Sequence, residues 1–68
     1  MQPGQTVYST RAREALIAAM AADLVTLRRQ HGAANRGDLA AMGWTEAEIG
    51  ALGFRAAALA ADVERRPA

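Results

Sequence analysis

The chain has 68 residues with eight arginines, seven acidic residues, no lysine and no cysteine, and its formal net charge is +1. This length allows one domain at most, and the lack of cysteine excludes disulfides, thiolate metal ligands and thiol nucleophiles. A net charge so close to zero gives no global field that would attract a polyanion. No apolar segment typical of a signal peptide follows the polar start, so we expect a cytoplasmic protein with no membrane contact.

The first predicted element is one long helix. Residues 1–8 contain Pro3 and Gly4 and are expected to form a loose N-terminal lead-in. Either Ser9 or Thr10 is a suitable N-cap for a helix that continues to about His31, where Gly32 is the natural stop. Apolar residues recur at intervals of three and four within it, which predicts one buried stripe formed by Ile17, Met20, Leu24 and Leu27.

The centre of the chain, residues 38–54, contains the same pattern twice. Its two copies read Asp38-Leu39-x-Ala41-Met42-Gly43-Trp44 and Glu48-Ile49-x-Ala51-Leu52-Gly53-Phe54. Glycine just past a helix adopts the left-handed conformation easily, and the next residue then packs back onto the last turns. The pattern therefore predicts two short helices, each ended by glycine and closed by an aromatic contact: Leu39 with Trp44, and Ile49 with Phe54.

Capping residues support both short helices. Asn35 is a good N-cap with Asp38 three positions on, and Thr45 with Glu48 forms a capping box. A last helix is expected from about Arg55 to Arg65, ended by Pro67. Because an apolar stripe runs from Ile49 to Val63 through Gly53, one continuous helix stays open as an alternative, but the glycine favours a break or kink.

These elements predict an all-α fold in a single domain over residues 1–68. It is a small bundle of three to four helices, with a long first helix, two short glycine-terminated helices and a C-terminal helix. There is no stretch rich in β-branched residues that would predict a sheet.

The residues suited to catalysis are too few and too scattered to predict an enzyme. The chain has one histidine, one serine and one tyrosine. His31 stands next to Arg28 and Arg29 with no neighbouring carboxylate to orient it, and Ser9 serves better as a cap. Glu46 and Glu48 lie two positions apart, and so on different faces of a helix. We expect no enzymatic activity, no cofactor and no metal site.

The segment around Gly43 resembles a helix-turn-helix motif. Aligning Gly43 with the glycine of the motif's turn puts apolar residues at its core positions, namely Met42, Trp44, Ile49 and Leu52. Leu39 and Asp38 depart from the pattern, which has a small and an apolar residue there. The resemblance implies a nucleic-acid-binding regulator, but the recognition face would present Glu46 and no arginine, asparagine or glutamine.

A second resemblance involves Leu27-Arg28-Arg29 and residues 41–49, Ala-Met-Gly-Trp-Thr-Glu-Ala-Glu-Ile. This pattern is similar to short arginine-rich proteobacterial proteins of uncharacterised domain type, whose motif reads acid-Ile-Gly-Leu-Ser/Thr-Arg-x-Glu-Ile. The resemblance implies a role in RNA-linked regulation. The chain departs from it at Ala41, which replaces the acidic residue, and at Glu46, which replaces the arginine.

The composition favours a protein that acts by binding another protein as a regulator, adaptor or inhibitor. Aromatic residues and arginines dominate the energy of protein interfaces, and these candidates are Arg28, Arg29, Arg36, Trp44, Phe54 and Arg55. The alternative is that the two aromatic residues pack in the core and that the arginines lie on a solvated surface. Alanine-rich helix faces leave a homodimer open as well, and nucleic acid is the second class of partner.

Overall fold

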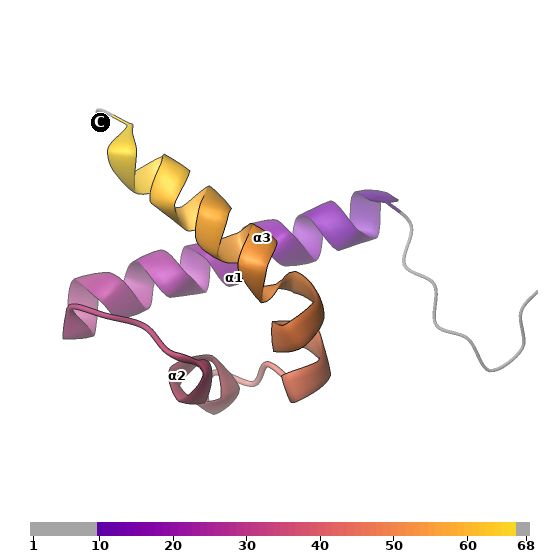
Figure 1. Cartoon of the computed structure of the whole chain (residues 1–68), viewed down its shortest axis with the longest axis horizontal. Helices are drawn as coiled ribbons and strands as arrows, with labels where there is room; N and C mark the ends of the chain where they lie inside the picture. Colours follow the sequence, from indigo (N-terminus) through magenta and orange to yellow (C-terminus); the bar gives the residue numbers. More distant parts are fainter. Residues whose placement is uncertain (1–9, 67–68) are drawn as a thin grey trace, which may run out of the picture.

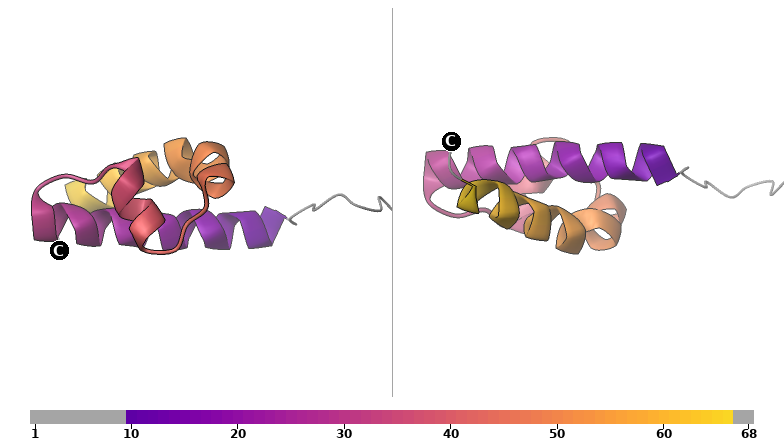
Figure 2. Two further views of the ribbon diagram at one scale, coloured as in Figure 1. Left: turned by 90° about the horizontal axis from the view of Figure 1, so that it is seen from below. Right: turned by 90° about the horizontal axis from the view of Figure 1, so that it is seen from above.

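The computed structural model describes residues 10–66, which form three helices joined by short loops. They are α1 (Thr10–His31), α2 (Arg36–Ala41) and α3 (Glu46–Arg65). Figure 1 shows α3 crossing α1, with α2 and the start of α3 on one side of α1 in this view and the end of α3 on the other. Figure 2 shows α3 lying against one face of α1. No strand occurs between residues 10 and 66, which confirms the all-α prediction. The predicted lead-in, Ser9 and Pro67 lie outside the described residues.

Helix α1 forms the long side of the molecule, and its apolar stripe is buried as predicted. Ile17, Met20, Leu24 and Leu27 are all buried, and Met20 has no exposed surface. Gly32 ends the helix with a positive φ of 82°, a conformation that glycine adopts at little cost. Thr10 is already helical, so it is not the cap.

Helix α2 begins and ends as its sequence predicts. The Asn35 side chain accepts a hydrogen bond from the Asp38 amide at 2.9 Å, and the Asp38 carboxylate accepts one from the Asn35 amide at 3.1 Å. At the other end, Gly43 has a φ of 107°. The Trp44 amide donates to the Leu39 carbonyl at 3.2 Å, and the Gly43 amide donates to the Ala40 carbonyl at 3.0 Å. This pair of bonds is a Schellman motif, which satisfies the last carbonyls of the helix.

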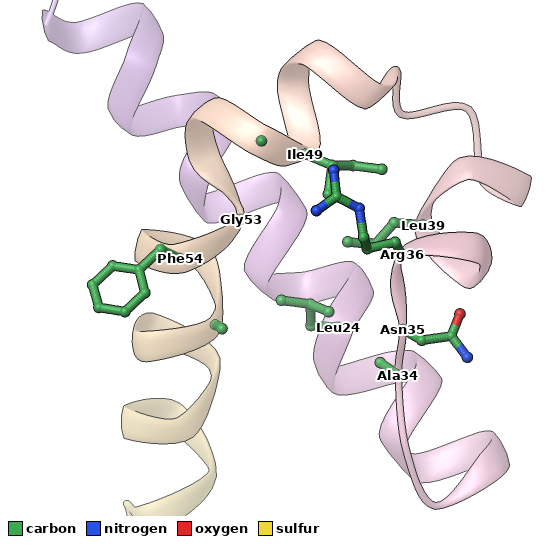
Figure 3. A pocket seen from close by; sticks show the side chains of 10 residues that line it. Leu24, Ala34, Asn35, Arg36, Leu39, Ile49, Gly53 and Phe54 are labelled. Atoms are coloured by element: carbon green, nitrogen blue, oxygen red, sulfur yellow. The ribbon is translucent and has the colours of Figure 1, made fainter.

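Helix α3 starts at the predicted capping box, in which the Glu48 amide donates to the Thr45 hydroxyl at 3.1 Å. The predicted separation into two helices at Gly53 is wrong, because α3 continues to Arg65. Gly53 does not have the positive φ that ends α1 and α2. The alanine-rich sequence beyond it favours helix, and buried contacts with α1 lie on both sides of it. The ribbon does bend near Gly53 (Figure 3), as is common for helices at glycine.

The second predicted aromatic contact, between Ile49 and Phe54, is also wrong. Phe54 is 87% exposed, whereas Ile49 is buried. An aromatic residue packs back onto the helix only where the chain reverses at a left-handed glycine. Since the helix continues through Gly53, Phe54 follows helical geometry and its ring is directed into solvent, away from the core.

The core lies between α1 and α3, and Leu39 of α2 closes one side of it. From α3 it receives Ile49, Leu52, Ala56 and Ala60, and the two alanines have no exposed surface. Small residues at these positions let the two helices approach closely. The predicted stripe therefore buries Ile49, Leu52 and Ala56, but Leu59 is half-buried and Val63 is 43% exposed.

Candidate functional site

Phe54 is the most exposed large apolar side chain in the described part of the chain. The other two that are exposed, Met42 and Val63, are 44% and 43% accessible, about half the value of 87% for Phe54. Phe54 lies on α3 one residue after the bend, and Figure 3 shows its ring pointing away from α1 and α2 into solvent. Because this nearly bare phenylalanine lies next to an apolar depression, the surface around it is the candidate contact site.

A groove lies beside Phe54, between α3 and the start of α2, with α1 as its floor (Figure 3). Its volume is about 360 Å³. We call it the Phe54 groove, and its lining consists of Leu24, Ala34, Asn35, Arg36, Leu39, Ile49, Gly50, Gly53, Phe54 and Ala57. Most of these residues are apolar or small, which is typical of a surface that binds by excluding water.

Arg36 is the single charged residue in the lining of the Phe54 groove. It is the first residue of α2 and is exposed, and Figure 3 shows its side chain extending toward Ile49. None of the ion pairs found between residues 10 and 66 involves Arg36. The neighbouring Asn35 side chain is engaged as the cap of α2. The groove therefore offers apolar contact area and one arginine that forms no ion pair within residues 10–66.

Two of the predicted arginines are paired with acids across the two long helices. Arg28 on α1 forms an ion pair with Glu64 on α3, and Arg55 on α3 forms one with Glu14 on α1 at 3.3 Å. The side chains of the second pair are more than half exposed, so that pair contributes little to stability. Both pairs hold the arginine heads against this molecule, which makes them less available to a partner than Arg36.

The predicted Trp44 lies in the loop between α2 and α3 and faces inward. Its indole Nε1 donates a hydrogen bond of 2.7 Å to Oδ2 of Asp23 in the middle of α1. The ring is half-buried and packs against the core. Sequence reasoning missed Asp23. Its position directly before Leu24, which the helical period predicts to be buried, was the available signal. It placed an acid at the edge of the core, where its carboxylate can accept a hydrogen bond from a tryptophan N–H.

Arg29, the remaining candidate, lines a different depression on the other side of α3. This α1–α3 groove has a volume of about 400 Å³ and is lined by Ala18, Ala21, Ala22, Val25, Arg29, Leu59 and Val63. The six predicted contact residues thus do not form one site. Only Arg36 and Phe54 meet in the same groove, and the sequence did not indicate that Gly50 and Gly53 would line it with them.

The face of α3 that a helix-turn-helix would present carries acidic and small residues. Thr45, Glu46, Ala47, Gly50 and Ala51 are all exposed, and the only charge among them is negative. His31 is exposed at the end of α1. Within residues 10–66, no cluster of three or more His, Cys, Asp or Glu side chains could hold a metal ion.

No protein-family model matches the chain, and neither the curated proteins nor the solved structures include a match. Among the described residues, no helix has both the length and the apolar character needed to cross a bilayer. The resemblances to helix-turn-helix proteins and to short arginine-rich proteins therefore rest on the quoted residues alone.

Proposed function

We propose that this protein acts by binding another protein and covering part of its surface, with Phe54 and the Phe54 groove as the contact site. The single observation that carries the proposal is the 87% exposure of Phe54 beside an apolar groove of about 360 Å³. Folding gains almost nothing from an apolar ring in this position, whereas an interface gains the burial of the ring and of the groove together.

Burial of Phe54 would make a measurable contribution to such binding. Burying a phenylalanine side chain completely contributes about 1.5–3 kcal/mol, and every 1.4 kcal/mol changes the dissociation constant about tenfold. Phe54 alone therefore supplies a factor of about ten to a hundred. Arg36 adds a charged contact at the edge of the same surface, which favours a correctly oriented partner over others.

The charges on the exposed side of α3 support a protein partner in preference to nucleic acid. Its first turn presents Glu46 and Glu48. Acids at this position repel phosphates, and binding to nucleic acid depends mainly on phosphate contacts. The two classes of partner also differ in a measurable property, because phosphate contacts weaken steeply with salt and apolar contacts do not.

A capture experiment with matched variants tests the proposal. The tagged full chain, its Phe54→Ala variant and a Val63→Ala control are incubated with lysate of the native host, with and without nuclease, and bound proteins are quantified by mass spectrometry. Val63→Ala is the appropriate control because it also removes an exposed apolar side chain from α3, but outside the Phe54 groove.

We expect a protein that the parent chain and Val63→Ala retain at raised salt and after nuclease, and that Phe54→Ala loses. Equal capture by Phe54→Ala and the parent chain would contradict the proposal. Loss of every partner on nuclease treatment would favour the nucleic-acid-binding regulator instead.

A further inference from the structure

Gly50 and Gly53 line the Phe54 groove at positions where neither a left-handed backbone conformation nor a close contact requires glycine. Both lie within α3, and neither has a positive φ. A Cβ atom added at Gly50 would meet no atom within 4 Å, and one added at Gly53 would lie 3.7 Å from Cγ2 of Ile49, an ordinary contact. Alanine would therefore fit at both positions and would favour the helix more. A residue that weakens a helix, and that no backbone conformation or contact requires, is expected at a position whose surface serves binding.

Glycine in a helix offers a second chain close access to the backbone. Gly50, Gly53 and Ala57 follow one another at helical spacing along the groove wall, so a partner meets no side chain larger than a methyl group at these three positions. Small residues of this kind allow two helices to pack at short distance. The alternative mode, addition of a strand to a sheet edge, is not available on the all-helical described residues.

The charge of the groove indicates what the partner carries. Arg36 is its single charged residue, it has no ion pair among residues 10–66, and no carboxylate lines the groove. A second copy of this chain docked groove to groove would bring one Arg36 toward the other without an acid between them. A different protein that brings a carboxylate is electrostatically complementary.

We propose that the Phe54 groove binds an amphipathic α-helix of a partner protein. The apolar stripe of that helix lies against α3 at Gly50 and Gly53, and one of its carboxylates pairs with Arg36. The Phe54 ring points away from α1 and α2, so it contacts the same partner protein beside the helix that lies in the groove. This inference rests on the proposed function and deepens it, because it specifies the secondary structure and the charge of the partner segment.

A peptide-display selection against the immobilised full chain tests the inference without a known partner. We expect the enriched peptides to show apolar residues at spacings of three and four, together with an aspartate or glutamate. The strongest binder is then synthesised and titrated against Gly50→Leu, Arg36→Glu and the Val63→Ala control. Gly50→Leu fills the close-approach position, and leucine is a good helix former, so folding is retained.

Binding should fall at least about tenfold for Gly50→Leu and for Arg36→Glu, and should not change for Val63→Ala. Replacing the acidic residue of the peptide by lysine should restore binding to Arg36→Glu, which only a direct charge pair would produce. The milder Gly50→Ala variant should unfold at a higher temperature than the parent chain and yet bind the peptide less tightly. If Gly50 were not part of the contact, Gly50→Ala would raise the unfolding temperature and leave binding of the peptide unchanged.

Several results would overturn the inference: no enriched peptide, enriched peptides that are basic or lack helical spacing, or equal binding by Gly50→Leu and the parent chain. Sedimentation of the full chain as a dimer that Phe54→Ala dissociates would identify a second copy as the occupant and would overturn it too. If lysate capture depends on Phe54 but not on Gly50 or Arg36, the proposed function stands and this inference fails.

Discussion

Replacing Phe54 by alanine should leave the free energy of unfolding almost unchanged. The side chain is 87% exposed, so only about an eighth of the 1.5–3 kcal/mol that full burial contributes is lost, which is about 0.2–0.4 kcal/mol. Alanine favours a helix over phenylalanine by up to about 0.5 kcal/mol, which offsets this loss. A buried phenylalanine would instead cost about 3–5 kcal/mol on the same substitution.

Urea unfolding followed by far-UV circular dichroism and by the fluorescence of Trp44, the single tryptophan, measures this difference. The control is Leu52→Ala on the same helix, where the side chain is 3% exposed and about 2–5 kcal/mol should be lost. A loss above about 1.5 kcal/mol for Phe54→Ala would mean that the ring packs on the body in solution, as the repeated pattern of residues 38–54 predicted. Phe54 would then be a core residue and not a contact site.

Three further predictions concern other contacts. Trp44→Phe removes the Nε1 hydrogen bond and leaves the half-buried Asp23 without this partner, so we expect the free energy of unfolding in urea to fall by about 1–2 kcal/mol. An unchanged midpoint of the urea transition would show that water replaces the indole as the donor. Thr45→Ala deletes the N-cap of α3 and should lower stability by about 1 kcal/mol in thermal unfolding, whereas Thr45→Ser should retain most of it. Arg29→Glu changes a charge that lies outside the Phe54 groove, so binding of the captured partner should not change in a titration. A loss as large as that of Phe54→Ala would show that the interface extends to the α1–α3 groove.

The helix ends that the sequence predicts correctly depend on interactions within a few residues. Asn35 caps with Asp38, and Thr45 with Glu48, three positions apart in the chain. Gly32 and Gly43 stop their helices through their own backbone conformation. The buried stripe of α1 follows from the helical period alone. In each case the deciding energy is local, so the order of residues is enough.

The candidate site was only partly predictable. Arg36 and Phe54 were both predicted as contact residues, because arginine and aromatic side chains dominate interfaces. That they share one groove follows from the packing of α2 against α3, for which the sequence contains no signal. The ion pairs of Arg28 with Glu64 and of Arg55 with Glu14 join residues far apart in the chain, so they could not be read from spacing.

The contrast between Gly43 and Gly53 separates what the sequence by itself determined from what the tertiary structure decided. Both glycines follow the same short pattern, and the sequence determined that both could end a helix. At Gly43 the chain turns, and Trp44 finds Leu39 and Asp23 inside the fold. At Gly53 the buried contacts of Ile49, Leu52, Ala56 and Ala60 with α1 hold both halves of α3 in one helix. The free energy of that burial outweighs the weak tendency of one glycine to end the helix, and the continuous helix leaves Phe54 on the surface.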